Sequence, residues 1–213
     1  MSAALKKAAQ ALAIWTVALL VIRQVRPRLL SVPQLWMLAG VGVAANVLQP
    51  AYSPFERQRT PADRWTALQI LWTVYAVQIG AVAELCFRRV PPPVDALTWT
   101  ALAAMLGGLG LRTWAVATLG RWFTWNVAVQ PGQRLVTSGP YRFVRHPSYT
   151  GALLTFLAAC LLLRSYRAAA FAAIALPAAF LRRIGHEERL LQTTFPEYRQ
   201  YVVRTGALLP RIR

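Results

Sequence analysis

The sequence contains few of the side chains that soluble enzymes commonly use for chemistry. Its 213 residues include only 7 Asp and Glu, 2 His and 2 Cys. Because metal sites are built from these residue types, no metal partner is expected. Cys86 and Cys160 lie in apolar stretches without a CxxC motif, which is typical of buried thiols. Only 15% of the residues are charged, which excludes the highly charged, weakly hydrophobic composition of a disordered chain.

The composition is instead that of a membrane protein. Hydrophobic residues make up 56% of the chain and the formal net charge is +17, whereas a soluble domain is about 45–50% apolar. The Lys and Arg residues occur in short groups between apolar runs, as residues that flank membrane helices do, and not on one face of a polar domain. The sequence therefore predicts a lipid bilayer partner and no nucleic acid.

Six apolar runs are candidate membrane spans, namely Ala8–Ile22, Gln34–Leu48, Trp65–Phe87, Ala96–Leu119, Pro147–Leu163 and Ala168–Leu181. They predict an all-α, polytopic integral membrane protein with about five to six membrane helices. The first run lacks an A-x-A cleavage site, which favours an uncleaved helix over a signal peptide. The last two runs predict a C-terminal helical hairpin. Its second arm, which contains Pro177, is shorter than the about 20 residues of a full span and is expected to leave the membrane early.

The distribution of Lys and Arg predicts the orientation of these helices. If each run crosses the membrane once, the larger share of basic residues, Arg57, Arg59 and Arg64 among them, falls on the side of the N-terminus. The positive-inside rule then places both termini in the cytoplasm. The long connection 120–146 and the tail 182–213 lie on this same side, so the active site is expected at the cytoplasmic face. Trp65 and Trp99 are expected to be interfacial anchors.

Polar and small residues inside the runs have structural explanations. Arg112 and Glu84 lie near helix ends, so their side chains are expected to extend to the membrane interface. The cluster Gly107-Gly108-Leu109-Gly110 follows no strand and is therefore not a dinucleotide-binding loop. Small residues of this kind allow membrane helices to pack closely.

Two polar segments are candidates for chemistry. Residues 145–149 (RHPSY) stand at the mouth of a membrane helix, where free backbone N–H groups favour a carboxylate or phosphate. In the second segment, Arg183 and Glu187 are four residues apart and share one helix face. A solvent-exposed ion pair and a functional role both stay open here, although an adjacent Glu187-Glu188 pair is unexpected in a chain with so few acids.

The two segments together resemble the signature of a known enzyme family. The motif RHPxYxG at residues 145–151, followed after a hydrophobic stretch by Glu187-Glu188, is similar to that of the isoprenylcysteine carboxyl methyltransferases and the related phospholipid methyltransferases. Residues 111–120 (LRTWAVATLG), 135–142 (LVTSGPYR), 195–201 (FPEYRQY) and 208–210 (LLP) extend the similarity. It covers roughly residues 110–212. A single domain, 1–213, would then consist of generic membrane spans at 1–110 and a catalytic region at 111–213.

The resemblance implies a membrane methyltransferase that uses S-adenosylmethionine without a Rossmann fold. The cofactor-binding residues that it implies are Asn126, Gln133, Arg134, Leu135, Val136, Tyr141, His146, Pro147, Ser148, Tyr149 and Glu187. Asn126 stands where the carboxyl methyltransferases commonly have Gln, and Pro196 replaces the usual Gly after Phe195. Arg183 is implied to bind the carboxylate of the acceptor. Arg183, Glu187 and Glu188 form the implied catalytic set.

The chemistry of these residues agrees with the implied roles. Tyr141 and Tyr149 offer aromatic faces to a sulfonium cation or a base, and Glu187 can pair with an ammonium group. The implied reaction is carboxyl O-methylation of an isoprenylcysteine-like lipophilic acceptor that enters from the membrane. A carboxylate is already nucleophilic, so it needs positioning rather than a base.

Two other functions stay open. The first is N-methylation of a phospholipid of the phosphatidylethanolamine type, or methylation of another small lipophilic acceptor. An amine would require a general base, for which Glu188 and His186 are the candidates. The second is a non-catalytic membrane scaffold or transporter. The polar residues cluster at one membrane face rather than near its midplane, which disfavours a transporter.

Overall fold

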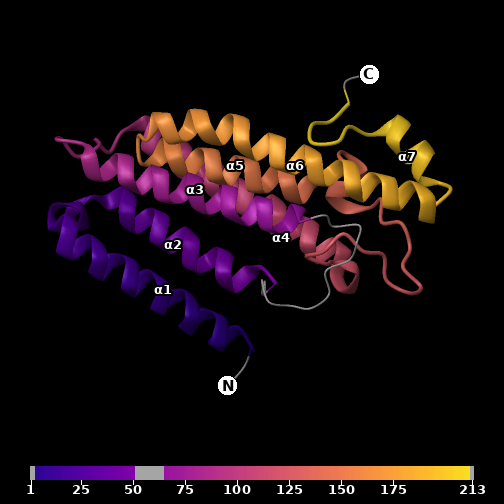
Figure 1. Cartoon of the computed structure of the whole chain (residues 1–213), viewed down its shortest axis with the longest axis horizontal. Coiled ribbons are helices and arrows are strands. Elements are labelled where there is room, and N and C mark those ends of the chain that lie inside the picture. Colours follow the sequence, from indigo (N-terminus) through magenta and orange to yellow (C-terminus); the bar gives the residue numbers. More distant parts are fainter. Residues whose placement is uncertain (1–2, 51–64, 212–213) are drawn as a thin grey trace.

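The computed structural model describes residues 3–50 and 65–211, in which every regular element is a helix (Figure 1). The α-helices are α1 Ala3–Val25, α2 Pro33–Leu48, α3 Thr66–Phe87, α4 Ala96–Leu119, α5 Pro147–Leu162, α6 Tyr166–Thr194 and α7 Tyr198–Arg204. Three 3₁₀ turns are η1 Pro27–Ser31, η2 Gly120–Trp122 and η3 Gly139–Arg142. Within the described ranges, α1, α3, α4 and α6 are long and apolar enough to span a membrane, and α2 and α5 are shorter apolar helices. The expected all-α, polytopic fold is confirmed.

Local sequence signals explain where several helices begin. Pro33 and Pro147 occupy the first turns of α2 and α5, where a backbone N–H is not needed. Asp95 caps α4, because its carboxylate accepts the backbone N–H of Thr98 at 3.2 Å while the Thr98 hydroxyl accepts the N–H of Asp95 at 3.4 Å. With Pro147 in its first turn, α5 starts directly after His146, which is the N-cap residue.

Helices α4 and α5 pack closely because one glycine faces another. A Cβ atom on Gly108 would lie 2.6 Å from the Gly151 carbonyl oxygen, and one on Gly151 would lie 2.5 Å from that of Gly108. Added Cβ atoms on Gly107 and Gly110 would meet nothing within 4 Å. The close packing expected of the glycine cluster is therefore found at Gly108 and not at Gly107 or Gly110. The close approach also brings the backbone of Arg112 next to α5.

The second arm of the C-terminal hairpin is longer than expected. Helix α6 is a single helix of 29 residues that continues through Pro177 to Thr194. The apolar run Ala168–Leu181 is thus only part of a longer helix, because Pro177 does not break it. Arg183 and Glu187 therefore lie on the same continuous helix as the apolar run, and both are positioned by its packing.

Glu84, near the end of α3, contacts the start of α6. Its carboxylate accepts the backbone N–H groups of Arg167 and Ala168, each at 3.1 Å, in the first turn of α6. These N–H groups have no partner within the helix, and a negative charge is favourable at a helix N-terminus. Glu84 of α3 thus caps the N-terminus of α6 from a neighbouring helix.

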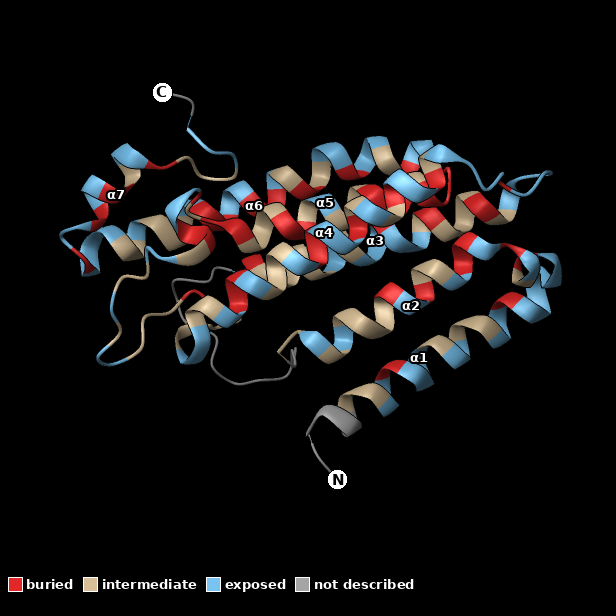
Figure 2. Cartoon of the chain, turned by 180° about the vertical axis from the view of Figure 1, so that it is seen from behind, coloured by how far each residue is buried: buried red, intermediate tan, exposed pale blue. Residues whose placement is uncertain are grey.

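The N-terminal helices form a hairpin that contacts the rest of the bundle mainly through α2 (Figure 1). Much of α1 is exposed or half-buried (Figure 2). Trp65 and Trp99 are both more than half exposed, as interfacial anchors are. Arg57, Arg59 and Arg64, which support the predicted orientation, lie outside the described residues.

Candidate functional site

The C-terminal tail holds the RHPSY segment at the start of α5. The backbone N–H groups of Arg145 and His146 donate to the carbonyls of Gly206 and Ala207 at 2.9 and 3.0 Å. The Thr150 hydroxyl donates to the Leu208 carbonyl at 2.7 Å. The connection 120–146 and the tail, which the sequence places on one side of the membrane, are thus in direct contact.

The charged residues of the two motifs form one ion-pair network. His146 lies between the two glutamates, with Nδ1 at 3.5 Å from Glu187 Oε2 and Nε2 at 3.1 Å from Glu188 Oε1. Arg145 Nε donates to Glu188 Oε1 at 2.8 Å. Arg183 Nε donates to Glu187 Oε1 at 3.0 Å. The two adjacent acids therefore have different arginine partners.

This network favours the charged form of His146. Its side chain is only 6% exposed, and such burial disfavours an imidazolium. Hydrogen bonds and charges from Glu187 and Glu188 outweigh the burial and raise the pKa of His146 above its usual 6.5. A protonated His146 then donates to both acids.

A cavity of about 920 Å³ opens beside the network. Ten of the implied cofactor-binding residues line it, namely Asn126, Gln133, Arg134, Leu135, Val136, Tyr141, His146, Ser148, Tyr149 and Glu187. Pro147 is buried in the first turn of α5 and is not among the lining residues. Arg183 also lines the cavity, whereas Glu188 and His186 do not. The structure thus separates Glu187, which faces the cavity, from Glu188.

Arg183 makes hydrogen bonds to several other elements. Its Nε donates to the Tyr149 hydroxyl at 2.6 Å, and its Nη2 donates to the Trp125 carbonyl at 2.6 Å. Its Nη1 donates to the Thr66 hydroxyl at 3.4 Å. The side chain is nearly fully buried, so it ties α6 to α5, to α3 and to the connection 120–146.

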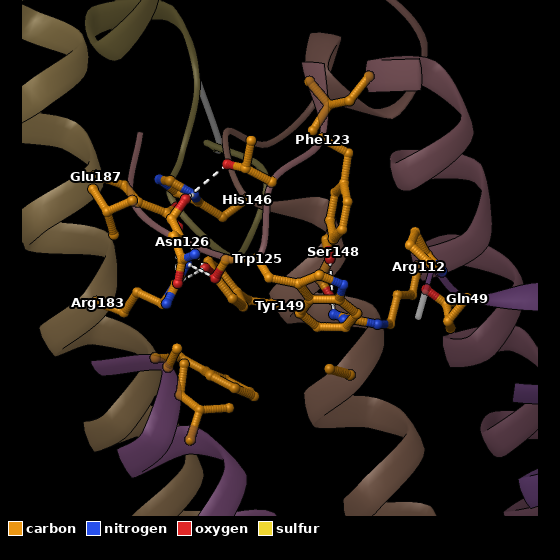
Figure 3. Close-up of a pocket in the computed structure, with 18 of the residues that line it drawn as sticks. Gln49, Arg112, Phe123, Trp125, Asn126, His146, Ser148, Tyr149, Arg183 and Glu187 are labelled. Atoms are coloured by element: carbon orange, nitrogen blue, oxygen red, sulfur yellow. Dashed lines mark hydrogen bonds and ion pairs between the residues drawn. The ribbon is translucent and has the colours of Figure 1, made fainter. Parts of the chain in front are cut away.

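Arg112 points into the cavity and not to the membrane interface, which corrects the sequence-based expectation. Its Nη1 donates to the Ser148 hydroxyl at 2.8 Å and to the Ser148 carbonyl at 3.3 Å. Its guanidinium lies 5.6 Å from the centre of the Trp125 ring. Its other N–H groups have no acceptor among the described residues. Figure 3 shows Arg112 on one side of the cavity and Glu187, His146 and Arg183 on the other.

Aromatic residues complete the cavity wall. Phe123 and Trp125 are in edge-to-face contact with ring centres 5.3 Å apart, and both line the cavity. Tyr198 of α7 also lines it, and its buried hydroxyl has no hydrogen-bond partner within the described part of the chain. Sequence reasoning missed these side chains. The only signal for Tyr198 was its place in the FPEY segment, and the tryptophans were attributed to the interface.

The arrangement agrees with the comparison to known families. Residues 100–193 match the model of the isoprenylcysteine carboxyl methyltransferase (ICMT) family. Over these residues, which are less than half of the chain, the sequence is similar to this family. The match to the ICMT family covers α5, almost all of α6 and most of α4, with the RHPSY segment and both glutamates. Helices α1 to α3 and α7, which also contribute to the cavity wall, lie outside it.

Curated relatives differ in their names. The cobalt-zinc-cadmium resistance protein CzcN of Cupriavidus metallidurans is 37% identical over 117 residues, which is 54% of this chain and 53% of that protein. The nickel-cobalt-cadmium resistance protein NccN of Alcaligenes xylosoxydans xylosoxydans is 33% identical over 116 residues, or 54% of each chain. A probable protein-S-isoprenylcysteine O-methyltransferase of Oryza sativa subsp. indica is 30% identical over 119 residues, which is 54% of this chain and 62% of that protein. The chain thus spans about half the length of the first two.

Proposed function

We propose that this chain, which is similar to the ICMT family over residues 100–193, is a membrane methyltransferase that transfers a methyl group from S-adenosylmethionine to the carboxylate of an isoprenylcysteine-like lipophilic acid. The main supporting observation is the position of Glu187. In a chain with only 7 acids, this carboxylate lines a cavity of about 920 Å³ and is held there by His146, Tyr149 and Arg183. In this proposal, the cavity and both termini lie at the cytoplasmic face.

The residues present fit the chemical groups of the cofactor. S-adenosylmethionine supplies an electrophilic methyl group and also carries an ammonium, a carboxylate and an adenosine. Glu187 Oε2, whose contact with His146 is 3.5 Å long, has capacity left to accept from the ammonium. The N-terminus of α5 can bind the carboxylate. The orphaned hydroxyl of Tyr198 would gain a partner from the adenosine, because buried polar groups are normally hydrogen-bonded.

The opposite side of the cavity fits an acidic amphiphile. Arg112 has N–H groups without an acceptor among the described residues, so it would bind the acceptor carboxylate more readily than Arg183, whose donors are engaged. Ile70, Leu71 and Val74 of α3 line the cavity as well and would contact a lipid chain. Because a carboxylate is already nucleophilic, the residues need only hold it in line with the methyl group and exclude water.

Phospholipid N-methylation is less well supported by the geometry. An ammonium headgroup must lose a proton before it can attack, which requires a base within reach. Glu188 is bound to Arg145 and His146, and neither Glu188 nor His186 lines the cavity. A cationic headgroup would also be repelled by Arg112. Metal resistance is part of the names of two relatives, and no observation on the described residues favours metal binding here.

The test is transfer of a tritiated methyl group from S-adenosylmethionine by the purified chain in detergent. N-acetyl-S-farnesylcysteine and phosphatidylethanolamine are compared as acceptors. We expect label in the farnesylated acid, as a base-labile ester. Label in phosphatidylethanolamine alone would contradict the proposed acceptor. A chain that does not bind S-adenosylmethionine would contradict the proposal that it is a methyltransferase.

A further inference from the structure

An exposed surface of apolar and basic side chains lies on α7 and the C-terminal tail, at the end of the bundle where α4 and α6 finish (Figure 1). Its three large apolar side chains are 48%, 67% and 74% exposed. Residues 199–211 contain three arginines and no acid. This surface, the tail patch, consists of Phe143, Val203, Leu209, Arg142, Arg204 and Arg211.

Hydrogen bonds bring the members of the tail patch together from two segments of the chain. Arg211 Nη1 donates to the Val203 carbonyl at 2.7 Å, which folds the tail back onto α7. The backbone N–H of Arg145 donates to the Gly206 carbonyl at 2.9 Å and so brings the neighbouring Phe143 to the same tail. The patch is therefore one surface of the folded chain.

The tail patch lies beside the start of an apolar helix. The Thr150 hydroxyl, near the beginning of α5, donates to the carbonyl of Leu208 at 2.7 Å. The next residue is Leu209, whose side chain is 74% exposed. Because the apolar run of α5 begins here, this side chain stands at the depth expected for the membrane interface. At that depth apolar side chains can enter the acyl region while arginines reach the headgroups.

The charge of the tail patch is not balanced by the protein. No salt bridge within the described residues involves Arg142, Arg204 or Arg211. Guanidinium groups bind phosphate oxygens well, often with two parallel hydrogen bonds. A soluble polyanion would match these arginines but would leave the apolar side chains exposed to water. An anionic phospholipid, which has a phosphate and acyl chains, matches both parts of the patch.

We propose that the tail patch binds the headgroups of anionic phospholipids in the bilayer and thereby fastens the tail to the start of α5. The tail accepts hydrogen bonds from the backbone N–H groups of Arg145 and His146. The Arg145 guanidinium also donates to the Val202 carbonyl at 3.3 Å. Lipid bound to the tail opposes the opening of these bonds, and therefore holds His146 in position at the cavity. The inference goes beyond the proposed function, because it makes the order of the site depend on the composition of the bilayer.

The first test is retention of lipid by the purified chain, measured by native mass spectrometry from detergent micelles that contain equal amounts of phosphatidylglycerol and phosphatidylcholine. We expect the wild type to retain phosphatidylglycerol preferentially. Arg142→Gln/Arg204→Gln should lower the retained ratio of the two lipids roughly tenfold, because each arginine near an anionic surface contributes to the attraction. The matched control is Arg121→Gln/Arg189→Gln, which removes the same charge from exposed positions. Arg121 also lies over the ring of the next residue, as Arg142 does, and this control should retain the ratio of the wild type.

Leu209→Asn separates a lipid from a soluble polyanion. This variant keeps every charge, and it should also lower the ratio because a lipid loses its apolar contact. An unchanged ratio in Leu209→Asn would point to a soluble polyanion and contradict a lipid.

The second test is hydrogen exchange at the backbone amides of Arg145 and His146 in nanodiscs. Exchange should be slower in nanodiscs that contain phosphatidylglycerol than in phosphatidylcholine alone, because bound lipid opposes local opening. Arg142→Gln/Arg204→Gln should remove this difference.

Equal retention of the two lipids by the wild type overturns the inference, as does an equal loss in both double variants. Identical exchange in the two bilayers contradicts the fastening of the tail. Neither measurement uses S-adenosylmethionine or a methyl acceptor. A chain that bound no cofactor would therefore contradict the proposed function and leave the tail patch as inferred.

Discussion

At the residue scale, two arginines share one cavity but have different surroundings. Arg183 has Glu187 as an ion-pair partner and donates to Tyr149 and Trp125. Arg112 donates to Ser148 and lies over the Trp125 ring. A cation whose hydrogen bonds are incompletely used in a low-dielectric cavity attracts an anion strongly. We therefore propose that Arg112 binds the acceptor carboxylate and that Arg183 holds Glu187 in place.

Arg112→Gln is expected to weaken use of the acid acceptor and spare the cofactor. Loss of one member of a buried charge pair costs about 2 kcal/mol or more, so kcat/KM for N-acetyl-S-farnesylcysteine should fall at least about thirtyfold. The dissociation constant of S-adenosylmethionine should stay within about threefold. Arg189→Gln, an exposed arginine that donates to its own helix, should change neither value. Equal effects of the two substitutions would refute the assignment.

His146 should make stability depend on pH. Its pKa in the folded state is raised above the usual 6.5 by Glu187 and Glu188. A raised pKa means that the stabilisation is complete below about pH 6.5 and is lost as the pH rises through the folded-state value. The melting temperature should therefore fall over this range in the wild type. His146→Gln should remove this fall of the melting temperature with pH, whereas His186→Gln, at the other histidine, should retain it. The reverse result would contradict the assignment of the pH dependence to the His146 network.

At the scale of elements, the approach of α4 to α5 depends on Gly108. A Cβ atom there would lie 2.6 Å from the Gly151 carbonyl, so Gly108→Ala must separate the helices. We expect a loss of about 1–3 kcal/mol in stability, as for other overpacked sites, and weaker cofactor binding because the start of α5, with Ser148 and Tyr149, is displaced. Gly107→Ala, next to it in open space, is the matched control. Thermal unfolding of the two variants should therefore differ.

The first turn of α6 depends on Glu84 of α3. Glu84→Gln should cost about 0.5–2 kcal/mol, the range for loss of a helix cap, and lower the melting temperature. Cofactor affinity should not change, because the cap lies at the opposite end of α6 from Glu187. Glu197→Gln, at an exposed acid, should have no effect on unfolding. A loss of cofactor binding in Glu84→Gln would contradict the separation of these two ends.

At the scale of the whole molecule, the apolar runs and the charges between them were sufficient to predict six apolar helices and to place the RHPSY and Glu187 segments on one side of the membrane. The expectation that the two segments form one site came from the resemblance to a family. The apolar runs could not predict which buried charges find partners across the fold. The side chains of Glu84 and Arg112 were expected at the membrane interface because their partners, Arg167 and Ser148, are distant in sequence. The length of α6 could not be predicted from its apolar run, because the charged residues after Leu181 end the run but not the helix.

The walls of the cavity could be predicted only in part. The motifs pointed to residues of the matched region, whereas Gln49 and the α3 residues have no local signal and contribute through packing alone. Tyr198 and Trp125 belong to this class too, since nothing in their neighbourhood in sequence separates a pocket aromatic from an interfacial one. The orientation across the membrane stays a prediction from the basic residues.

Calorimetric titration of the purified chain with S-adenosylmethionine tests the central claim most directly. We expect saturable binding with one cofactor per chain in the wild type. Glu187→Gln should abolish or strongly weaken the binding, because the ammonium loses its charged partner, while Glu197→Gln should bind like the wild type. Absence of binding to the folded wild-type chain, or full binding to Glu187→Gln, would contradict the account.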